Sequence, residues 1–418
     1  MSHPEPLAVL DQRDEERLQA IGTWGKEHFR TAVYQTPFHP RTSVLNVLNE
    51  WHRWKDYTTA DAYFDEALEY AAIRNACAVF DLTPMTKHRI TGPDALAFLN
   101  RLVTRDVAKI KAGKVGYCVW CDDNGQVIDD GTIFHLREGD YRLCSQERQL
   151  DWLMRSAPGF DVAIVEDTHD VAALALQGPT SCAVLKKLGL TGIENLTPFG
   201  IAVFDLAGRE LMVSRTGFTG DLGYELWIDP AGALDLWDGL FEVGADHGIR
   251  PMGTHALEVA RIEAGFMQAG VDFHPADQAV RLDRSRSPFE LDLGRLVDFK
   301  KPNFNGRRAL LEEQRRGSRY RFVRLDIEGN KPAKSSYIYD KRKNVIGTVT
   351  SAEWSPSAKA NIALASLKMP WGRPGDELWA EIYYQRELKW SRVMARCRVV
   401  EGAFFDPPRR RATPAGDF

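Results

Sequence analysis

The sequence has few cysteines, and they form no recognisable framework. Six cysteines in 418 residues are too few for a disulfide framework in so long a chain, and their number fits a reducing compartment. Cys118 and Cys121 make one CxxC, but it lies in GYCVWCDDNG, where a strand is expected to run into a turn, and no second CxxC follows. We therefore interpret both cysteines as core residues. The ten histidines show no HExxH, and no metal is predicted.

Long hydrophobic runs and an excess of one charge are also missing. No apolar stretch approaches the roughly 20 residues of a membrane helix, and the N-terminus lacks a basic segment followed by an apolar one. The net charge is -4, with basic residues spread along the chain, which is not the pattern of a nucleic-acid or membrane-surface protein. We expect a cytoplasmic protein that acts on small molecules.

Common catalytic signatures are absent as well. There is no GxSxG, no GxxxxGK[ST] and no GxGxxG after a strand, which argues against a hydrolase elbow, a P-loop and a flavin or nicotinamide dinucleotide site. The nearest motif is GFTGDLGYE, with glycines three apart. A hairpin between ELMVSRT and YELWID explains these glycines without any ligand.

What the sequence does have is enough apolar content for a large core and a regular succession of strands and helices. Hydrophobic residues make up 44% of the chain, and the length suggests roughly two to four domains. KHRITG, VGYCVW, QVIDDGTIFHL, YRLC and FDVAIVE are expected strands, with helices at PDALAFLNRLV and SQERQLDWLMRSA. This β-α-β-β-β-α-β order resembles a split βαβ layer, and a second such run begins at VAALALQGP.

The predicted fold is α+β, with two split βαβ-type layers and a C-terminal β-barrel or sandwich made from short strands such as RFVRLDI and LWAEIYY. The expected boundaries are 1–85 for an N-terminal arm and the start of domain 1, 86–168 for domain 2, 169–268 for the remainder of domain 1, 269–319 for a connector, 320–404 for the barrel and 405–418 for a disordered tail.

An aspartate pair on a predicted strand and an arginine on a predicted helix lie at positions where apolar residues are expected. A strand at NGQVIDDGTIF sends Asp129 and Asp130 to opposite faces, so one carboxylate must look inward, where it is costly unless it is paired or used. By itself this fits a functional role and a structural hydrogen bond equally. Arg261 lies on the helix HALEVARIEAG, whose other inward positions are apolar, and is either a surface residue, the more common case, or an anion clamp.

Seven motifs in register then resemble one known family. FDLTPM with ITG, GYCVWCDDNGQVIDD, LQGP, RTGFTGDLGYEL, ARIEAG, NFNGRRAL and TSAEWSP stand in the order and at about the spacing found in the glycine cleavage T-protein (aminomethyltransferase) superfamily. The resemblance covers roughly residues 35 to 400. It implies a three-domain cloverleaf in which tetrahydrofolate enters a central channel, with the pterin inward and the glutamyl tail toward solvent.

The resemblance also implies site residues. Asp129 matches the first Asp of G-x-[IV]-[IV]-D-D, which faces the reactive edge of the folate and is the expected catalytic carboxylate. Glu225, in GYELW, matches the glutamate that binds the pterin amino and ring N–H groups, a task for which a carboxylate suits. Arg261 matches the arginine of R-[LI]-E-A-G, Tyr117 an aromatic residue near the pterin, and Phe218 the tyrosine of YTG without its hydroxyl.

Departures from the family point to a changed substrate. Thr83-Pro84-Met85 replaces S-H-M, and NEWHRWKDYT replaces F-x-G-W-x-M-P. In these segments the chain looks more like the tetrahydrofolate-dependent demethylases of the superfamily, such as dimethylsulfoniopropionate demethylase and its relatives acting on betaines or aryl methyl ethers. The expected reaction moves a methyl group to N5 of tetrahydrofolate. A cationic donor would need aromatic faces, for which the candidates are Trp51, Trp54, Tyr57, Trp120 and Trp354, with at most two expected to touch it.

Two alternatives remain open within the resemblance. An aminomethyltransferase would give methylene-tetrahydrofolate and need a lipoyl-bearing partner protein. A non-catalytic folate-binding protein of the iron–sulfur maintenance type would carry K-G-C-Y-x-G-Q-E, a motif that this sequence lacks. The methyl transfer is the preferred hypothesis.

Overall fold

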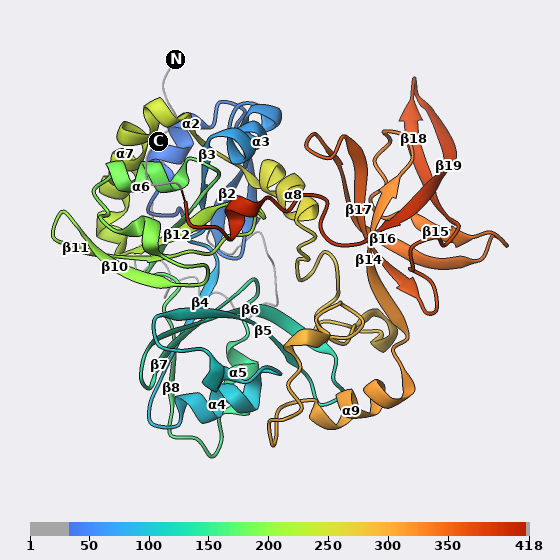
Figure 1. Ribbon diagram of the computed structural model, residues 1–418, viewed down its shortest axis with the longest axis horizontal. Helices are drawn as coiled ribbons and strands as arrows, with labels where there is room; N and C mark the ends of the chain where they lie inside the picture. The colour runs from blue at the N-terminus through green and yellow to red at the C-terminus, as the bar shows by residue number, and fades with distance from the viewer. Residues whose placement is uncertain (1–32, 415–418) are drawn as a thin grey trace, which may run out of the picture.

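Three β-structures meet around one central helix in the computed structural model, which describes residues 33–414 (Figure 1). They are a six-stranded sheet, a five-stranded sheet and a closed six-stranded barrel. The predicted α+β fold with two βαβ-type layers and a C-terminal barrel is confirmed. Most of the expected N-terminal arm, residues 1–32, lies outside the described residues.

The five-stranded sheet has the order β5-β6-β7-β4-β8 and is covered on one face by two helices. Its elements are β4 Thr86–Thr91, α4 Ala95–Leu102, β5 Lys114–Cys121, β6 Val127–Arg137, β7 Asp140–Ser145, α5 Leu150–Ser156 and β8 Ala163–Glu166. Helix α4 buries Ala95, Phe98, Leu99 and Leu102, at spacings of three and four, so a single apolar stripe faces the sheet.

The six-stranded sheet has the order β10-β11-β12-β9-β3-β13. Its strands are β3 Cys77–Asp81, β9 Ala172–Gln177, β10 Ile201–Leu206, β11 Arg209–Ser214, β12 Gly223–Ile228 and β13 Ile249–Pro251, and the helices on its outer face are α6 Ser181–Lys187 and α7 Ala233–Gly244. Because β3 precedes and β9 follows the five-stranded layer in sequence, the chain inserts one layer into the other.

Further elements join these layers. They are α2 His39–Leu45, the hairpin of β1 Glu50–Trp54 and β2 Tyr57–Ala62, α3 Glu66–Asn75, α8 Thr254–Glu263 and α9 Arg307–Arg316. Helix α8 lies between the six-stranded sheet and the barrel in Figure 1 and contacts α3, β2, β16 and β17. None of the helices in residues 33–414 is long and apolar enough to cross a membrane.

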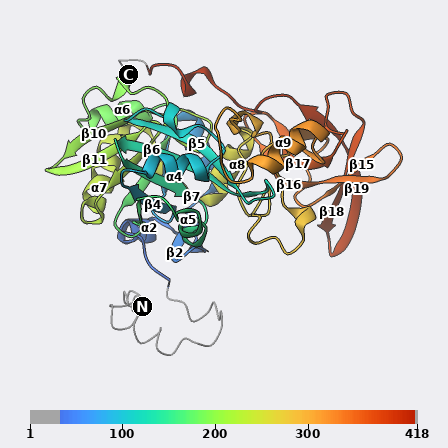
Figure 2. The same ribbon diagram turned by 90° about the horizontal axis from the view of Figure 1, so that it is seen from below.

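The barrel consists of β14 Tyr320–Ile327, β15 Tyr337–Asp340, β16 Val345–Ser355, β17 Ala360–Lys368, β18 Leu378–Arg386 and β19 Lys389–Val400. Alternate residues of these strands point inward and fill it with aliphatic side chains, such as Leu325, Ala363 and Ala365. It is therefore a packed core, and it stands beside the two sheets (Figures 1 and 2).

The two sheets pack against each other with their inner faces. Phe134 on β6 meets Trp227 on β12 edge to face, with ring centroids 5.1 Å apart. Val115 and Cys144 of one sheet and Ala173 of the other surround this pair. Residues that share a face with Phe134 or Trp227 therefore point into the region between the layers.

Residues 405–414, for which the sequence predicts a disordered tail, contact the six-stranded layer, and residues 415–418 lie outside the described residues. The tail leaves the barrel and crosses to the six-stranded layer (Figure 1). The Arg409 guanidinium binds both oxygens of Asp221, at 2.6 and 2.8 Å, and the Arg74 guanidinium lies 4.2 Å from the centre of the Phe405 ring. The sequence looked like a free basic end because these partners are far away along the chain.

Candidate functional site

Asp129 and Asp130 point to opposite faces of β6, as the strand pattern predicts, and Asp130 lies on the face of Phe134, beside residues that pack against α8, the connector and the barrel. Asp130 lies opposite Val119 in the ladder and shares its face with Phe134, whereas Asp129 lies opposite Trp120 on the helix-covered face. The expected role of Asp129 at the reactive edge of the folate stays a prediction. Both faces of the strand are covered, so its apolar pattern does not show which carboxylate looks to the centre.

Asp129 is fully buried and held by backbone groups. Its two oxygens accept hydrogen bonds from the backbone N–H of Asp130, at 2.8 Å, and of Glu147, at 3.1 Å. Burial and the neighbouring Asp130 raise the pKa of Asp129 well above its usual value, while the positive charge of Lys55 lowers it. The carboxyl is thus anchored, and its ionisation depends on the charges around it.

Asp130 is partly accessible and paired with an aromatic hydroxyl. The Tyr117 hydroxyl donates a hydrogen bond of 2.7 Å to Asp130 Oδ2. Burial raises the pKa of Asp130 to about 6, and the bond from Tyr117 opposes this rise. Burial and Asp130 raise the pKa of Tyr117, so the proton stays on the phenol. At neutral pH Asp130 is mostly an anion, and it can accept a proton from a ligand.

Glu225 lies on the inner face of the other sheet, two residues from Trp227. Its Oε2 accepts hydrogen bonds from Thr216 Oγ1 at 2.6 Å and Ser214 Oγ at 3.4 Å, whereas Oε1 has no partner among the described residues. Burial raises the pKa of Glu225 to about 7, against the effect of these two hydroxyls. A half-satisfied carboxyl of this kind can take a neighbouring pair of N–H donors.

The loop between β11 and β12 is shaped by close packing on Gln177. A Cβ atom at Gly217 would lie 1.9 Å from Gln177 Oε1, and one at Gly223 would lie 2.3 Å from it, so a larger residue at either position would displace the Gln177 side chain. The ring of Phe218, which is 37% exposed, stacks on Phe266 with centroids 5.5 Å apart. The hairpin interpretation of GFTGDLGYE is confirmed.

Arg261 is fully buried, and its partners all belong to the protein. Nε and Nη2 bind the Glu258 carboxylate, Nη2 also donates to Ser351, and Nη1 donates to Asp272 and to the Phe266 carbonyl oxygen. All five N–H groups are used, so none is left for a ligand anion. In this structure Arg261 joins α8 to the connector and the barrel, and its expected contact with the folate stays a prediction.

The five aromatic candidates do not form one cage. Trp120 is completely buried beneath the helices of the five-stranded sheet, and Trp354 is 48% exposed on the barrel, so neither supports the expected donor contact. Trp51, Trp54 and Tyr57 all lie on the β1–β2 hairpin, where the Tyr57 hydroxyl is 2.6 Å from His169 Nδ1.

Sequence reasoning missed Lys55, at the tip of the same hairpin. Its ammonium forms an ion pair with Glu147, the residue whose backbone N–H holds Asp129. The two partners are 92 residues apart, so no local spacing links them. The available signal was the replaced segment NEWHRWKDYT, which drew attention to aromatic residues instead.

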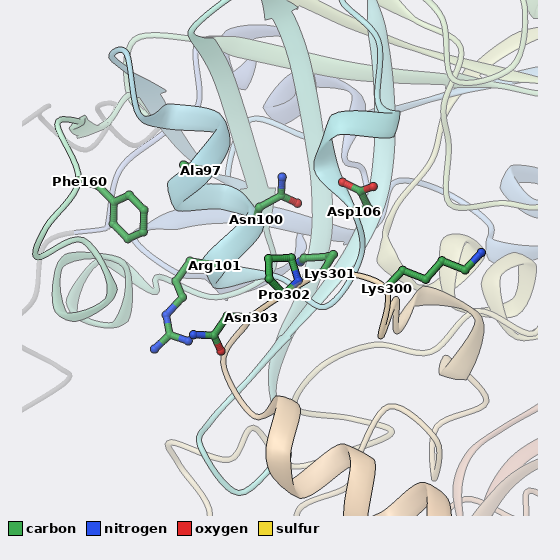
Figure 3. A pocket seen from close by; sticks show the side chains of 9 residues that line it. All are labelled: Ala97, Asn100, Arg101, Asp106, Phe160, Lys300, Lys301, Pro302 and Asn303. Carbon is green, nitrogen blue, oxygen red and sulfur yellow. The ribbon is translucent and has the colours of Figure 1, made fainter.

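A cavity of about 570 Å³ lies between α4 and the connector, away from these residues (Figure 3). Arg101, Asn100 and Asn303 lie on one side of it, while Lys300 points away from them. The buried Lys301 amine donates to the carbonyls of Val103 and Arg105, which ties the connector to the sheet. None of the residues predicted as site residues lines this cavity.

Glu50, Glu66 and His255 each place one possible metal-ligand atom within 4.8 Å of the others. They come from β1, α3 and α8, so no sequence motif reveals them. His255 Nδ1 is 2.7 Å from Glu66 Oε1, and this exposed ion pair accounts for the close approach without a metal. The absence of a metal stays a prediction.

Comparisons with known proteins cover nearly the whole described chain. The GCVT N-terminal domain matches residues 41–301, and the glycine cleavage T-protein C-terminal barrel domain matches residues 321–406. An aminomethyltransferase of Halothermothrix orenii is 32% identical over 335 residues, which are 79% of this chain and 90% of that protein. The trimethylamine-oxide aldolase of Ruegeria pomeroyi is 35% identical over 356 residues, covering 82% of this chain but 43% of the aldolase.

A solved structure shares the fold. The glycine cleavage system aminomethyltransferase T from Bartonella henselae superposes with a TM-score of 0.78 at 24% identity, over 90% of this chain and 99% of that one. The likeness extends through both sheets and the barrel.

Proposed function

The chain belongs to the glycine cleavage T-protein family of folate-dependent enzymes, and from this premise we propose that it moves a methyl group from a small methylated donor to N5 of tetrahydrofolate. Tetrahydrofolate acts as a co-substrate. The donor is a sulfonium, a methylated amine of the betaine type or an aryl methyl ether.

One observation carries this proposal: Asp130 and Glu225 lie on the two sheet faces that pack against each other, and both are partly accessible. Glu225 offers an unpaired oxygen to the pterin amino and ring N–H groups. Asp130, oriented by Tyr117, is the acceptor for the proton that N5 releases. Asp129 lies behind Asp130 and fixes its backbone N–H.

The enzyme contributes mainly by holding the reactants in place. Attack of N5 on a methyl carbon needs an in-line approach, and a well-oriented pair of reactants can gain about 7–11 kcal/mol relative to free reactants. Proton transfer to a positioned carboxylate adds roughly 10²–10⁴-fold. These two effects require no metal or dinucleotide.

The hairpin supports a changed donor. Its segment replaces a family motif, and three of the aromatic candidates lie on it, at Trp51, Trp54 and Tyr57. The aldolase relative is named for a methylated amine oxide, which favours a methylated nitrogen compound as donor. This chain matches 43% of the aldolase's own length.

Aminomethyl transfer is the second candidate. The Halothermothrix orenii relative, which is 90% covered, bears the name aminomethyltransferase. Such a reaction would yield methylene-tetrahydrofolate and use a lipoyl carrier protein as partner. The mass of the folate product separates the two reactions, because methyl- and methylene-tetrahydrofolate differ by two hydrogen atoms.

The first test is an anaerobic titration with tetrahydrofolate, followed by tryptophan fluorescence, in the wild type, Glu225→Ala and the surface control Glu387→Ala. We expect micromolar binding that Glu225→Ala weakens at least tenfold, because hydrogen bonds to a charged acceptor contribute about 1.5–3 kcal/mol, and that the control leaves unchanged. Methylated donors are then screened by product mass. Absence of folate binding in the wild type would overturn the proposal.

A further inference from the structure

Lys55 occupies a strained position at the tip of the β1–β2 hairpin. Its φ is 56°, in the left-handed region that a lysine rarely adopts. Such a backbone conformation is unfavourable, and it persists where the surroundings hold it or a function requires it. The Arg53 guanidinium donates to the Lys55 carbonyl oxygen and helps to hold the turn.

Two ion pairs clamp this tip to the loop that follows β7. The Lys55 ammonium pairs with Glu147, and the neighbouring Asp56 accepts a hydrogen bond of 2.5 Å from Arg148. The Lys55 side chain is only 17% exposed. Since the Glu147 backbone N–H binds Asp129, the hairpin tip is connected to the aspartate pair through one residue.

Besides burial, negative charges act on both aspartates, and the positive charge of Lys55 acts on Asp129. Asp277 raises the pKa of Asp129, and Asp272 raises that of Asp130. Lys55 lowers the pKa of Asp129. Burial lowers the pKa of Lys55 to about 8, and among nearby charges Asp129 affects it most, ahead of Arg148 and Asp56.

We propose that Lys55 is a positioning residue for the one-carbon transfer: through Glu147 and Asp129 it keeps the aspartate pair ionised, so that Asp130 can take the proton released from N5. The inference rests on the proposed function. Two adjacent carboxyls titrate as a pair, and a nearby cation lowers the pKa at which both become anions.

Lys55 supports a methyl transfer to N5 that is followed by loss of the N5 proton. With a sulfonium or betaine-type donor, the N5 electron pair forms a bond to the methyl carbon, and the bond from that carbon to sulfur or nitrogen breaks, leaving its electron pair on the donor heteroatom. The donor thereby loses its positive charge. The N5–H bond then breaks, and its proton passes to the Asp130 carboxylate, so no oxidant or reductant is needed.

Lys55→Asn tests this role with little risk to the fold, because asparagine tolerates the left-handed backbone. Lys343→Asn is the matched control: Lys343 also has a positive φ, of 63°, but lies on a barrel turn. Lys55→Arg retains the charge. The first readout is a carboxyl ¹³C NMR titration of aspartate-labelled protein, which needs no substrate.

We expect the apparent pKa of the aspartate pair to rise by about one unit in Lys55→Asn, and to stay close to the wild-type value in Lys55→Arg and Lys343→Asn. The apparent pKa of the acid limb of the kcat/KM profile should rise by the same amount. An unchanged aspartate titration in Lys55→Asn overturns the inference. If the titration shifts but no donor yields methyl-folate, Lys55 still sets the pair and the proposed reaction is wrong.

Discussion

Tyr117 donates a 2.7 Å hydrogen bond to Asp130 on the face of the five-stranded sheet that turns to the other layer. Asp129, next in the chain, points the other way, under Trp120 and the helices. The two aspartates therefore have different roles. The Asp130 carboxylate can contact a ligand, and Asp129 holds the Asp130 backbone N–H and affects its charge.

The two aspartates should respond differently to substitution. Asp130→Asn keeps an acceptor for Tyr117 but cannot take a proton, so turnover should fall roughly 10²-fold or more. Asp129→Asn should cost less, because it acts only through its neighbour. Single-turnover rates at saturating folate measure both losses. A larger loss in Asp129→Asn than in Asp130→Asn would mean that Asp129 is the carboxylate in contact with folate.

Much of this arrangement could be predicted from the sequence, and the remainder depends on distant contacts. Strand alternation places Asp129 and Asp130 on opposite faces, and the motifs indicate both layers and the barrel. The inward face could not be chosen, because helices cover one side of β6 and the second sheet covers the other. For Arg261 the sequence left open a surface role and an anion-binding role, and its burial against Asp272 and Ser351 could not be predicted because these partners lie on other elements.

Folate affinity should depend on the ionisation of Glu225. Its pKa in the folded protein is about 7, and pterin N–H donors need the carboxylate, so affinity should fall about tenfold per pH unit below 7. Fluorescence titrations between pH 5.5 and 8.5, which spans the transition, measure this. Glu225→Gln should bind folate weakly at every pH and lose most of the dependence. An equally steep fall in Glu225→Gln would assign the titration to another group.

The free energy of unfolding should fall as pH rises through the titration of Glu225, whereas folate affinity rises. The folded-state pKa of Glu225 lies above the usual value of 4.5, so the folded protein binds the proton more tightly than the unfolded chain does. Its ionisation therefore destabilises the fold progressively as pH rises from about 4.5 to 7. At pH 8, without folate, Glu225→Gln should be more stable by on the order of 1–3 kcal/mol. Urea unfolding at pH 8 tests this, and a less stable variant would contradict it.

Substitution of Arg261 should lower the free energy of unfolding more than it lowers folate affinity. Arg261→Ala leaves the fully buried Asp272 side chain without its guanidinium partner, at a cost of about 3–5 kcal/mol. Arg261→Met with Asp272→Leu removes both charges and should recover part of this loss, because no buried ion remains unpaired. Urea unfolding of the single and double variants provides the comparison. A stable Arg261→Ala protein that binds folate poorly would restore the ligand role expected from the sequence.

The C-terminal tail should contribute to stability through Arg409. Its guanidinium binds both oxygens of the buried Asp221, but the Arg409 side chain is 39% exposed, so the loss in Arg409→Ala is expected at about 1–2 kcal/mol. Arg398→Ala is the matched control, since Arg398 pairs with Asp326 and is 77% exposed; that variant should lose under about 1 kcal/mol. Urea unfolding measures the loss of stability in each variant, and proteolysis near residue 405 measures release of the tail. Equal stability of the two variants would mean that the tail rests on the surface without holding the layer.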